Sequence, residues 1–163
     1  MDVGCGAGIH LEGYSGRSLG IDASEENINI CHRKKLNVIK GEACHLPVKS
    51  NGFDTVFLSH ILEHLEEPEK ALNEAYRIIK NSGRIIVVAP CWQGFIAYWD
   101  KGHKHFIIED FLDQVLLDRL GCEKVKSYTF PPFTSPVLAK YRELRAIYQK
   151  RILEANNAGE YEA

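Results

Sequence analysis

Apolar and polar positions follow two different periods along this chain. Short apolar runs predict strands over residues 18–21, 36–39, 55–59, 84–89 and 122–130. Between several of these runs, apolar residues recur every three or four positions, which is the period of a helix packed on one side. Strands that alternate with such helices are typical of βαβ units around a parallel sheet. We therefore predict an α/β fold with a mostly parallel sheet flanked by helices.

Helix boundaries can be placed from residues with special backbone roles. Ser24 can cap a helix that ends near Lys34. Pro68 suits the first turn of a second helix, because its missing N–H would be unpaired there in any case. We expect that helix to end at residues 81–83. A third helix should stop at Gly121, since glycine readily closes a helix in the left-handed conformation.

The C-terminal residues predict a separate unit. Residues 137–154 fit a helical period, and we expect the tail after Ala155 to be disordered. Basic residues interleave with the apolar positions, at Lys140, Arg142, Arg145, Lys150 and Arg151. Such a helix packs its apolar side on the domain, or else lies on a membrane surface or a partner. We expect residues 1–132 to form the main domain and residues 133–163 the C-terminal helix and tail.

Composition narrows the class of protein. A chain of 163 residues fits one domain, and a formal net charge of −2 gives no case for nucleic acid as a partner. The longest apolar runs fall short of the roughly 20 residues that span a bilayer, so there is no firm membrane signal. The five cysteines are dispersed, with no C-x-x-C pair. This pattern predicts reduced thiols in a cytoplasmic protein.

A glycine-rich segment opens the chain. Gly4, Gly6 and Gly8 stand where a strand would turn into a helix, and glycines there let a ligand approach the backbone closely. Dinucleotide binders use G-x-G-x-x-G, but Ile9 occupies the third glycine position, which favours a ligand without a pyrophosphate. Asp22 follows the next predicted strand, where an acid can accept hydrogen bonds from both ribose hydroxyls.

Six ordered segments together resemble a class I S-adenosylmethionine-dependent methyltransferase of the small-molecule type. The matching segments are residues 2–8, 20–22, 41–47, 53–64, 78–84 and 100–106. The resemblance covers about residues 2–130 and implies a Rossmann-like fold. The family's first strand needs about four more residues than this chain supplies, so we expect a truncated first strand at the centre of the sheet. This gap motivates an alternative function, a binding module that keeps the fold without the chemistry, and it makes a homodimer an open option.

The resemblance also implies residue roles. The three glycines would lie along the methionine moiety and the sugar of S-adenosylmethionine. Asp2 would hold the amino group of this donor, Asp22 the ribose hydroxyls and Glu42 the adenine amine. The Ala43 amide would lie beside the adenine. Ser59, at the end of its predicted strand, completes the set of cofactor-binding candidates.

The chemistry needs few catalytic groups. Methyl transfer from a sulfonium is an in-line displacement, and a base is needed only when the acceptor must lose a proton. His60 and His103 are the candidates for contact with the small-molecule acceptor. An aromatic cluster, Trp92, Phe95, Tyr98 and Trp99, could line an apolar acceptor pocket.

Residues 60–64 pose a separate alternative. The sequence His60-Ile61-Leu62-Glu63-His64 matches H-x-x-E-H, in which two histidines on one helical face bind zinc. A zinc hydrolase is therefore a remote alternative. Pro68 interrupts the helix that this motif needs, and the methyltransferase resemblance accounts for the segment without a metal, so we expect none. A nicotinamide oxidoreductase is a further alternative, against which Ile9 argues.

Overall fold

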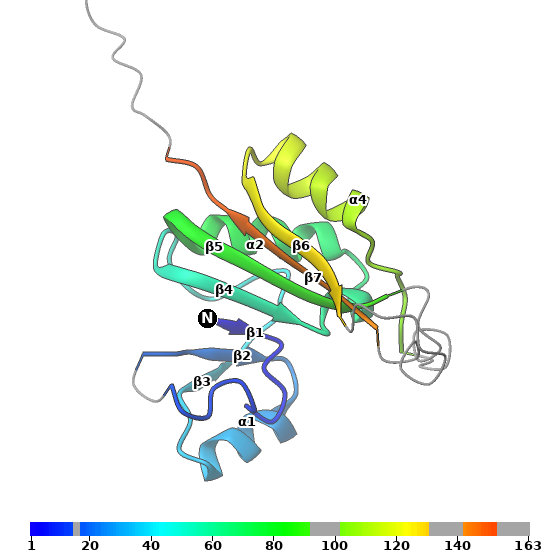
Figure 1. Ribbon diagram of the computed structural model, residues 1–163. Helices are drawn as coiled ribbons and strands as arrows, with labels where there is room; N and C mark the ends of the chain where they lie inside the picture. Colours follow the sequence, from blue (N-terminus) through cyan, green and yellow to red (C-terminus); the bar gives the residue numbers. More distant parts are fainter. Residues whose placement is uncertain (15–16, 92–101, 131–141, 153–163) are drawn as a thin grey trace, which may run out of the picture.

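A seven-stranded sheet organises the protein. The computed structural model describes residues 1–14, 17–91, 102–130 and 142–152 (Figure 1). The strand order is β3-β2-β1-β4-β5-β7-β6. The strands are β1 (Asp2–Val3), β2 (Gly20–Asp22), β3 (Val38–Lys40), β4 (Phe53–Ser59), β5 (Ile79–Pro90), β6 (Glu123–Phe130) and β7 (Glu143–Gln149). Strands β1 to β5 pair in parallel, whereas β7 is antiparallel to both β5 and β6. The predicted α/β fold with a mostly parallel sheet is confirmed.

Strand β1 is short but central. Its two residues, Asp2 and Val3, pair with β2 on one side and with β4 on the other. The Cys5 amide and the Gly4 amide both donate to the carbonyl of Ile21, which extends the contact with β2 beyond the ladder. The first strand is therefore short, and its expected place in the middle of the sheet is confirmed.

Five helical elements lie in the described residues, and the two with predicted starts, after Ser24 and at Pro68, begin there. The five elements are α1 (Glu25–Arg33), η1 (Leu62–His64), α2 (Pro68–Ile78), α4 (Glu109–Asp113) and η2 (Gln114–Arg119). The Ser24 hydroxyl accepts from the Asn27 amide at 3.4 Å, so Ser24 caps α1 as predicted. Helix α2 ends earlier than expected, because Ile79 already pairs with Phe53 of β4. The α4 helix continues directly into the π-helical turns of η2, and Gly121 follows in the left-handed conformation.

The predicted C-terminal helix is wrong over the described residues 143–149, which form strand β7. Buried and partly exposed residues alternate along it, with Leu144, Ala146 and Tyr148 buried. That period of two fits a strand, and the ladders to β5 and β6 satisfy the backbone on both sides. The C-terminal segment is thus part of the sheet. The remainder of the predicted helix at 137–141, and the tail after Ala155, lie outside the described residues.

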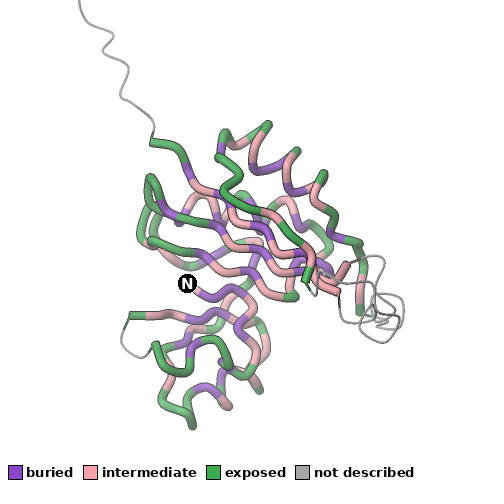
Figure 2. The backbone as a smooth tube through the Cα atoms, viewed as in Figure 1, coloured by how far each residue is buried: buried purple, intermediate pink, exposed green. Residues whose placement is uncertain are grey.

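The two faces of the sheet differ in their cover (Figures 1 and 2). Buried side chains of β4, β5 and β7 join α2 and η2 in the main hydrophobic core, which includes Leu58, Val87 and Leu116. On the opposite face, α1 covers β2 and β3 through a second, smaller core. Across β4, β5 and β7 this second face keeps partly exposed apolar residues, including Phe57 and Ile86.

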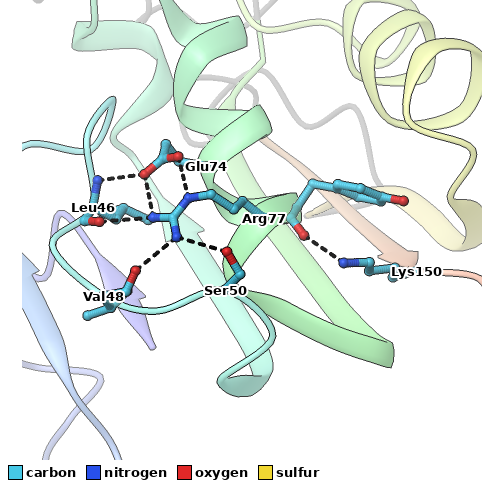
Figure 3. Close-up of polar contacts among 7 residues, drawn as sticks. Leu46, Val48, Ser50, Glu74, Arg77 and Lys150 are labelled. Carbon is cyan, nitrogen blue, oxygen red and sulfur yellow. Dashed lines mark hydrogen bonds and ion pairs between the residues drawn. The ribbon is translucent and has the colours of Figure 1, made fainter.

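Two buried or half-buried cations tie the elements together (Figure 3). Arg77 of α2 donates to both Glu74 carboxylate oxygens and to the carbonyls of Leu46 and Val48. It thereby fixes the segment that follows residues 42–43. The Lys150 ammonium, just after β7, donates to the carbonyls of Tyr76 and Ile79. Burial lowers the pKa of Lys150, and these carbonyls compensate part of that desolvation.

Candidate functional site

The glycine loop depends on its glycines for two reasons. Gly4, Gly6 and Gly8 have φ angles of +73°, +53° and +81°, which side chains rarely adopt. A Cβ atom on Gly4 would also lie 2.8 Å from Ile61, and one on Gly8 would lie 2.4 Å from Leu36. At Gly6 the space is open, so only the backbone conformation favours glycine there. The loop can therefore bend between β1 and the segment that leads to β2.

Asp22 holds the glycine loop and the start of α1 together. One carboxylate oxygen accepts from the Gly6 amide at 2.8 Å. The other accepts from the Ser24 amide at 2.9 Å and from the Asn27 side chain at 3.1 Å. A carboxylate offers about four acceptor sites, so capacity for a ligand hydroxyl remains. The sequence predicted Asp22, but the supporting role of Asn27 depends on helix geometry and was missed.

A narrow cleft brings four predicted cofactor residues together. Its volume is about 90 Å³, and Gly4, Asp22, Glu42 and Ala43 are among the residues that line it. Ile61 and Leu65 form its apolar side. An acid on one side and aliphatic side chains on another suit a flat, polar-edged ring such as adenine. Ile61 and Leu65 were not predicted, because their approach to Gly4 follows from the chain path around η1.

Asp2 is a buried carboxylate without compensation. Its side chain is 4% exposed, and neither oxygen has a hydrogen-bond partner within the described residues. The His10 ring is close by, with its Nδ1 3.7 Å from Oδ2. The Met1 ammonium, which could have competed for this carboxylate, instead donates to the Thr55 carbonyl. Burial raises the pKa of Asp2, so this group fits a ligand that brings a positive charge.

Ser59 and His60 lie at the carboxyl end of β4, where ligands of parallel sheets bind. They line a hollow of about 380 Å³ that is distinct from the narrow cleft. His60 has a φ of +51°, and its ring contacts two carboxylates, Glu143 at 3.0 Å and Glu63 at 3.4 Å. The neighbouring Glu63 carboxylate, and then Glu143, raises the pKa of His60.

His103 lies against η1. Its ring centroid is 4.8 Å from that of His64. The Lys104 amide donates to the Glu63 carbonyl at 2.7 Å, which joins this segment to η1. The aromatic cluster at residues 92–99 lies outside the described residues.

The zinc-protease interpretation of residues 60–64 is wrong in its geometry. That motif needs both histidines on one helical face. His60 instead has a left-handed backbone conformation and lies ahead of η1, which contains only Leu62–His64. The two histidine rings also have different partners, since His64 contacts the Gly102 carbonyl and His60 contacts Glu143.

Comparisons with known proteins agree with this fold. Residues 1–87, more than half of the chain, match the family described as methyltransferase domain. The chain therefore belongs to this family of methyltransferase domains, as the sequence resemblance implied. Among the described residues, none of the helices has the length and apolar character needed to cross a membrane.

Individual relatives support the same family. A protein of unassigned function in a Streptomyces fradiae transposon is 32% identical over 96% of this chain and 50% of its own length. Demethylmenaquinone methyltransferase of Oceanobacillus iheyensis is 26% identical over 91% of this chain and 66% of that enzyme. A solved SAM-dependent methyltransferase of Thermotoga maritima is 25% identical, with a TM-score of 0.74, over 92% of this chain and 81% of that one. The chain thus spans between half and two thirds of the length of these curated relatives.

Proposed function

We propose that this chain binds S-adenosylmethionine and transfers its methyl group to a small-molecule acceptor in the cytoplasm. The observation that carries the proposal is the joint placement of Gly4, Asp22, Glu42 and Ala43 around one cleft. S-adenosylmethionine supplies a methyl group on a sulfonium that is already activated for in-line displacement. The protein then needs to bind, align and desolvate the reactants.

Each residue has a defined part in this proposal. Asp22 accepts a ribose hydroxyl with its remaining acceptor site, while Glu42 accepts from the adenine amine beside the Ala43 amide. Asp2, buried and uncompensated, pairs with the ammonium of the donor. Because the three glycines lack Cβ atoms, the loop admits the methionine moiety. His60 or His103 takes a proton from an acceptor that must lose one.

The lining of the second hollow supports a small-molecule acceptor. Ser59 and His60 open onto the hollow of about 380 Å³, whose other lining residues include Phe57, Ile86 and Tyr128. Such an apolar wall suits a small organic molecule. The presence of demethylmenaquinone methyltransferases among the relatives also supports a small-molecule acceptor. All five cysteines are free thiols, which suits a cytoplasmic location.

Calorimetric titration with S-adenosylhomocysteine tests the donor site. We expect binding by the wild type and at least about tenfold weaker binding by Asp22→Asn and by Glu42→Gln, since each loses a charge-assisted hydrogen bond. Asp54→Asn is the matched control, because Asp54 is exposed and pairs only with Lys80 among the described residues. A wild type without affinity, or one that binds NADH instead, contradicts the proposal.

The same protein separates an enzyme from a binding module. Radiolabelled S-adenosylmethionine should lose its methyl group to at least one acceptor in a panel of phenols, quinols and amines. Donor binding without transfer to any acceptor would favour the module that keeps the fold and has lost the chemistry.

We further propose that two chains associate through the incompletely covered sheet face. Two hollows, of about 600 Å³ and 380 Å³, lie on this face and share His10, Phe57 and Ile86. Partly exposed apolar residues along such hollows favour association with another surface. A second copy of the chain is the proposed occupant of this face.

A further inference from the structure

Three potential metal ligands converge beside the end of β4. Glu63 and His64 belong to η1, and His103 lies in the segment that precedes α4. One ligand atom from each of these side chains lies within 4.8 Å of the other two. Two imidazoles and a carboxylate form a donor set that suits zinc and other first-row divalent ions better than magnesium or calcium.

Glu63 gives an independent reason to expect a cation. Its side chain is 1% exposed, and neither carboxylate oxygen has a hydrogen-bond partner within the described residues. His60 Nδ1, at 3.4 Å, is close enough for an ion pair but does not meet hydrogen-bond geometry. A buried carboxylate in this state is costly unless a positive charge is bound. A metal ion in the cluster would supply that charge.

The surroundings also orient the ligands. His64 Nδ1 lies 3.1 Å from the Gly102 carbonyl, which can only accept, so Nδ1 carries the proton. In the neutral ring Nε2 then has the free lone pair that a metal needs, as in many metal sites where the second ring nitrogen donates to a carbonyl. The Lys104 and His105 amides donate to the Glu63 carbonyl at 2.7 and 3.3 Å, which holds the two segments in register.

We propose that Glu63, His64 and His103 bind one divalent transition-metal ion, with zinc as the probe. Ligand atoms about 2.1 Å from a tetrahedral zinc lie about 3.4 Å apart, so small side-chain rotations close the cluster. Three protein ligands leave a fourth position for water or for an oxygen atom of a bound molecule. The site does not depend on the proposed methyl transfer. With His103 bound to metal, His60 is the general-base candidate that remains.

This site differs from the one that the H-x-x-E-H spacing suggested. The zinc-protease motif would use Glu63 as general base, whereas here Glu63 is a ligand and His103 replaces His60. The sequence predicted no metal, because Pro68 interrupts the helix that the motif needs and the methyltransferase resemblance accounts for the segment. The third ligand of the proposed site could not be recognised from the motif. That ligand comes from a distant segment, which the backbone bonds to Glu63 bring into place.

Zinc titration of chelator-treated protein tests the proposal without any methyl donor. We expect one ion per chain in the wild type, a zinc-induced rise in melting temperature, and visible absorption bands of coordinated cobalt when Co²⁺ replaces zinc. Glu63→Gln and His103→Asn should each weaken zinc binding by about 100-fold and remove the melting-temperature rise. Glu63→Gln also removes a buried charge, so the metal-free variant should fold at least as stably as the wild type.

His105→Asn is the matched control. His105 follows the cluster closely, but its ring contacts the Glu66 carbonyl rather than Glu63. This variant should keep the zinc affinity of the wild type. Absence of stoichiometric zinc in the wild type, or an equal loss of affinity in His105→Asn, would overturn the assignment. Neither result bears on affinity for S-adenosylhomocysteine, so the two proposals fail separately.

Discussion

Three carboxylates are central to the candidate sites, and their surroundings differ. Asp22 is already satisfied by three donors, so part of its role is structural whatever ligand binds. Asp2 and Glu63 are buried without hydrogen-bond partners among the described residues. Buried polar groups are normally paired, and unpaired ones point to a ligand or a stored cost in stability. We therefore expect these two buried carboxylates to lower the free energy of unfolding when no ligand is bound.

Asp2 makes that cost measurable through pH. Burial raises its pKa in the folded state, so folding favours the protonated form. Its contribution to stability is full below the ordinary pKa of about 4 and is lost as the pH rises through the raised value. We expect Asp2→Asn to be more stable than the wild type at pH 7, by on the order of 1 kcal/mol. The advantage should shrink toward pH 4.

Urea denaturation at both pH values gives the two free energies of unfolding. The same variant should bind S-adenosylhomocysteine more weakly, because the ammonium loses its partner. Asp54→Asn again serves as the control, with no gain in stability at pH 7, because hydrogen bonding to Lys80 lowers the pKa of Asp54. A less stable Asp2→Asn at neutral pH would contradict the expected cost of the buried charge.

Strand β7 forms although its local sequence pattern favours a helix. Apolar residues at 144, 147 and 148 fit one face of a helix, and this spacing favoured the wrong prediction. In the sheet, Leu144 and Tyr148 enter the main core, whereas Ile147 lies on the opposite face against a hollow. The pairing partners β5 and β6 decide this, because they satisfy the β7 backbone and bury alternate side chains.

Alanine substitutions distinguish the two geometries. Leu144→Ala should lower the free energy of unfolding by about 2–4 kcal/mol, since it leaves a cavity in a closed core. Ile147→Ala should cost less than half as much, because its side chain is only partly buried. Chemical denaturation of both variants gives the comparison. Equal losses would indicate that both residues share one buried face, as a helix requires.

Within the part of the chain that the structure describes, helices close one face of the sheet and cover the other face only in part. Helix α2 and the η2 segment seal the first face, while α1 covers only the β2–β3 part of the second. The two hollows occupy the remainder of that second face. This asymmetry explains why a chain with a complete core on one side can still expose apolar surface on the other.

We expect two chains to associate through this partly covered face of the sheet. Sedimentation should show a dimer that dissociates on dilution, and Ile86→Glu should shift it to monomer by placing a charge on the open face. Val125→Glu is the control, because Val125 is an exposed apolar residue on strand β6 that lines neither hollow. A wild type that stays monomeric at high concentration would rule out the second copy as occupant.

Local chemistry was enough to predict a large part of this protein. The cap at Ser24, the proline at the start of α2 and the glycine loop each act within a few residues of chain, so their structures could be read directly. The order of strands and helices likewise indicated the α/β fold. Gly4, Asp22, Glu42 and Ala43 were predicted as one site, and they do line one cleft.

Other features required the tertiary structure. Strand β7 forms because it pairs with β5 on one side and with β6 on the other. The local sequence pattern contains no information about pairing between such distant segments. Ile61 approaches Gly4, and His103 reaches Glu63, only after the chain has folded around η1. Burial likewise leaves the Asp2 and Glu63 carboxylates without hydrogen-bond partners among the described residues. Desolvation depends on what the whole fold packs around a side chain.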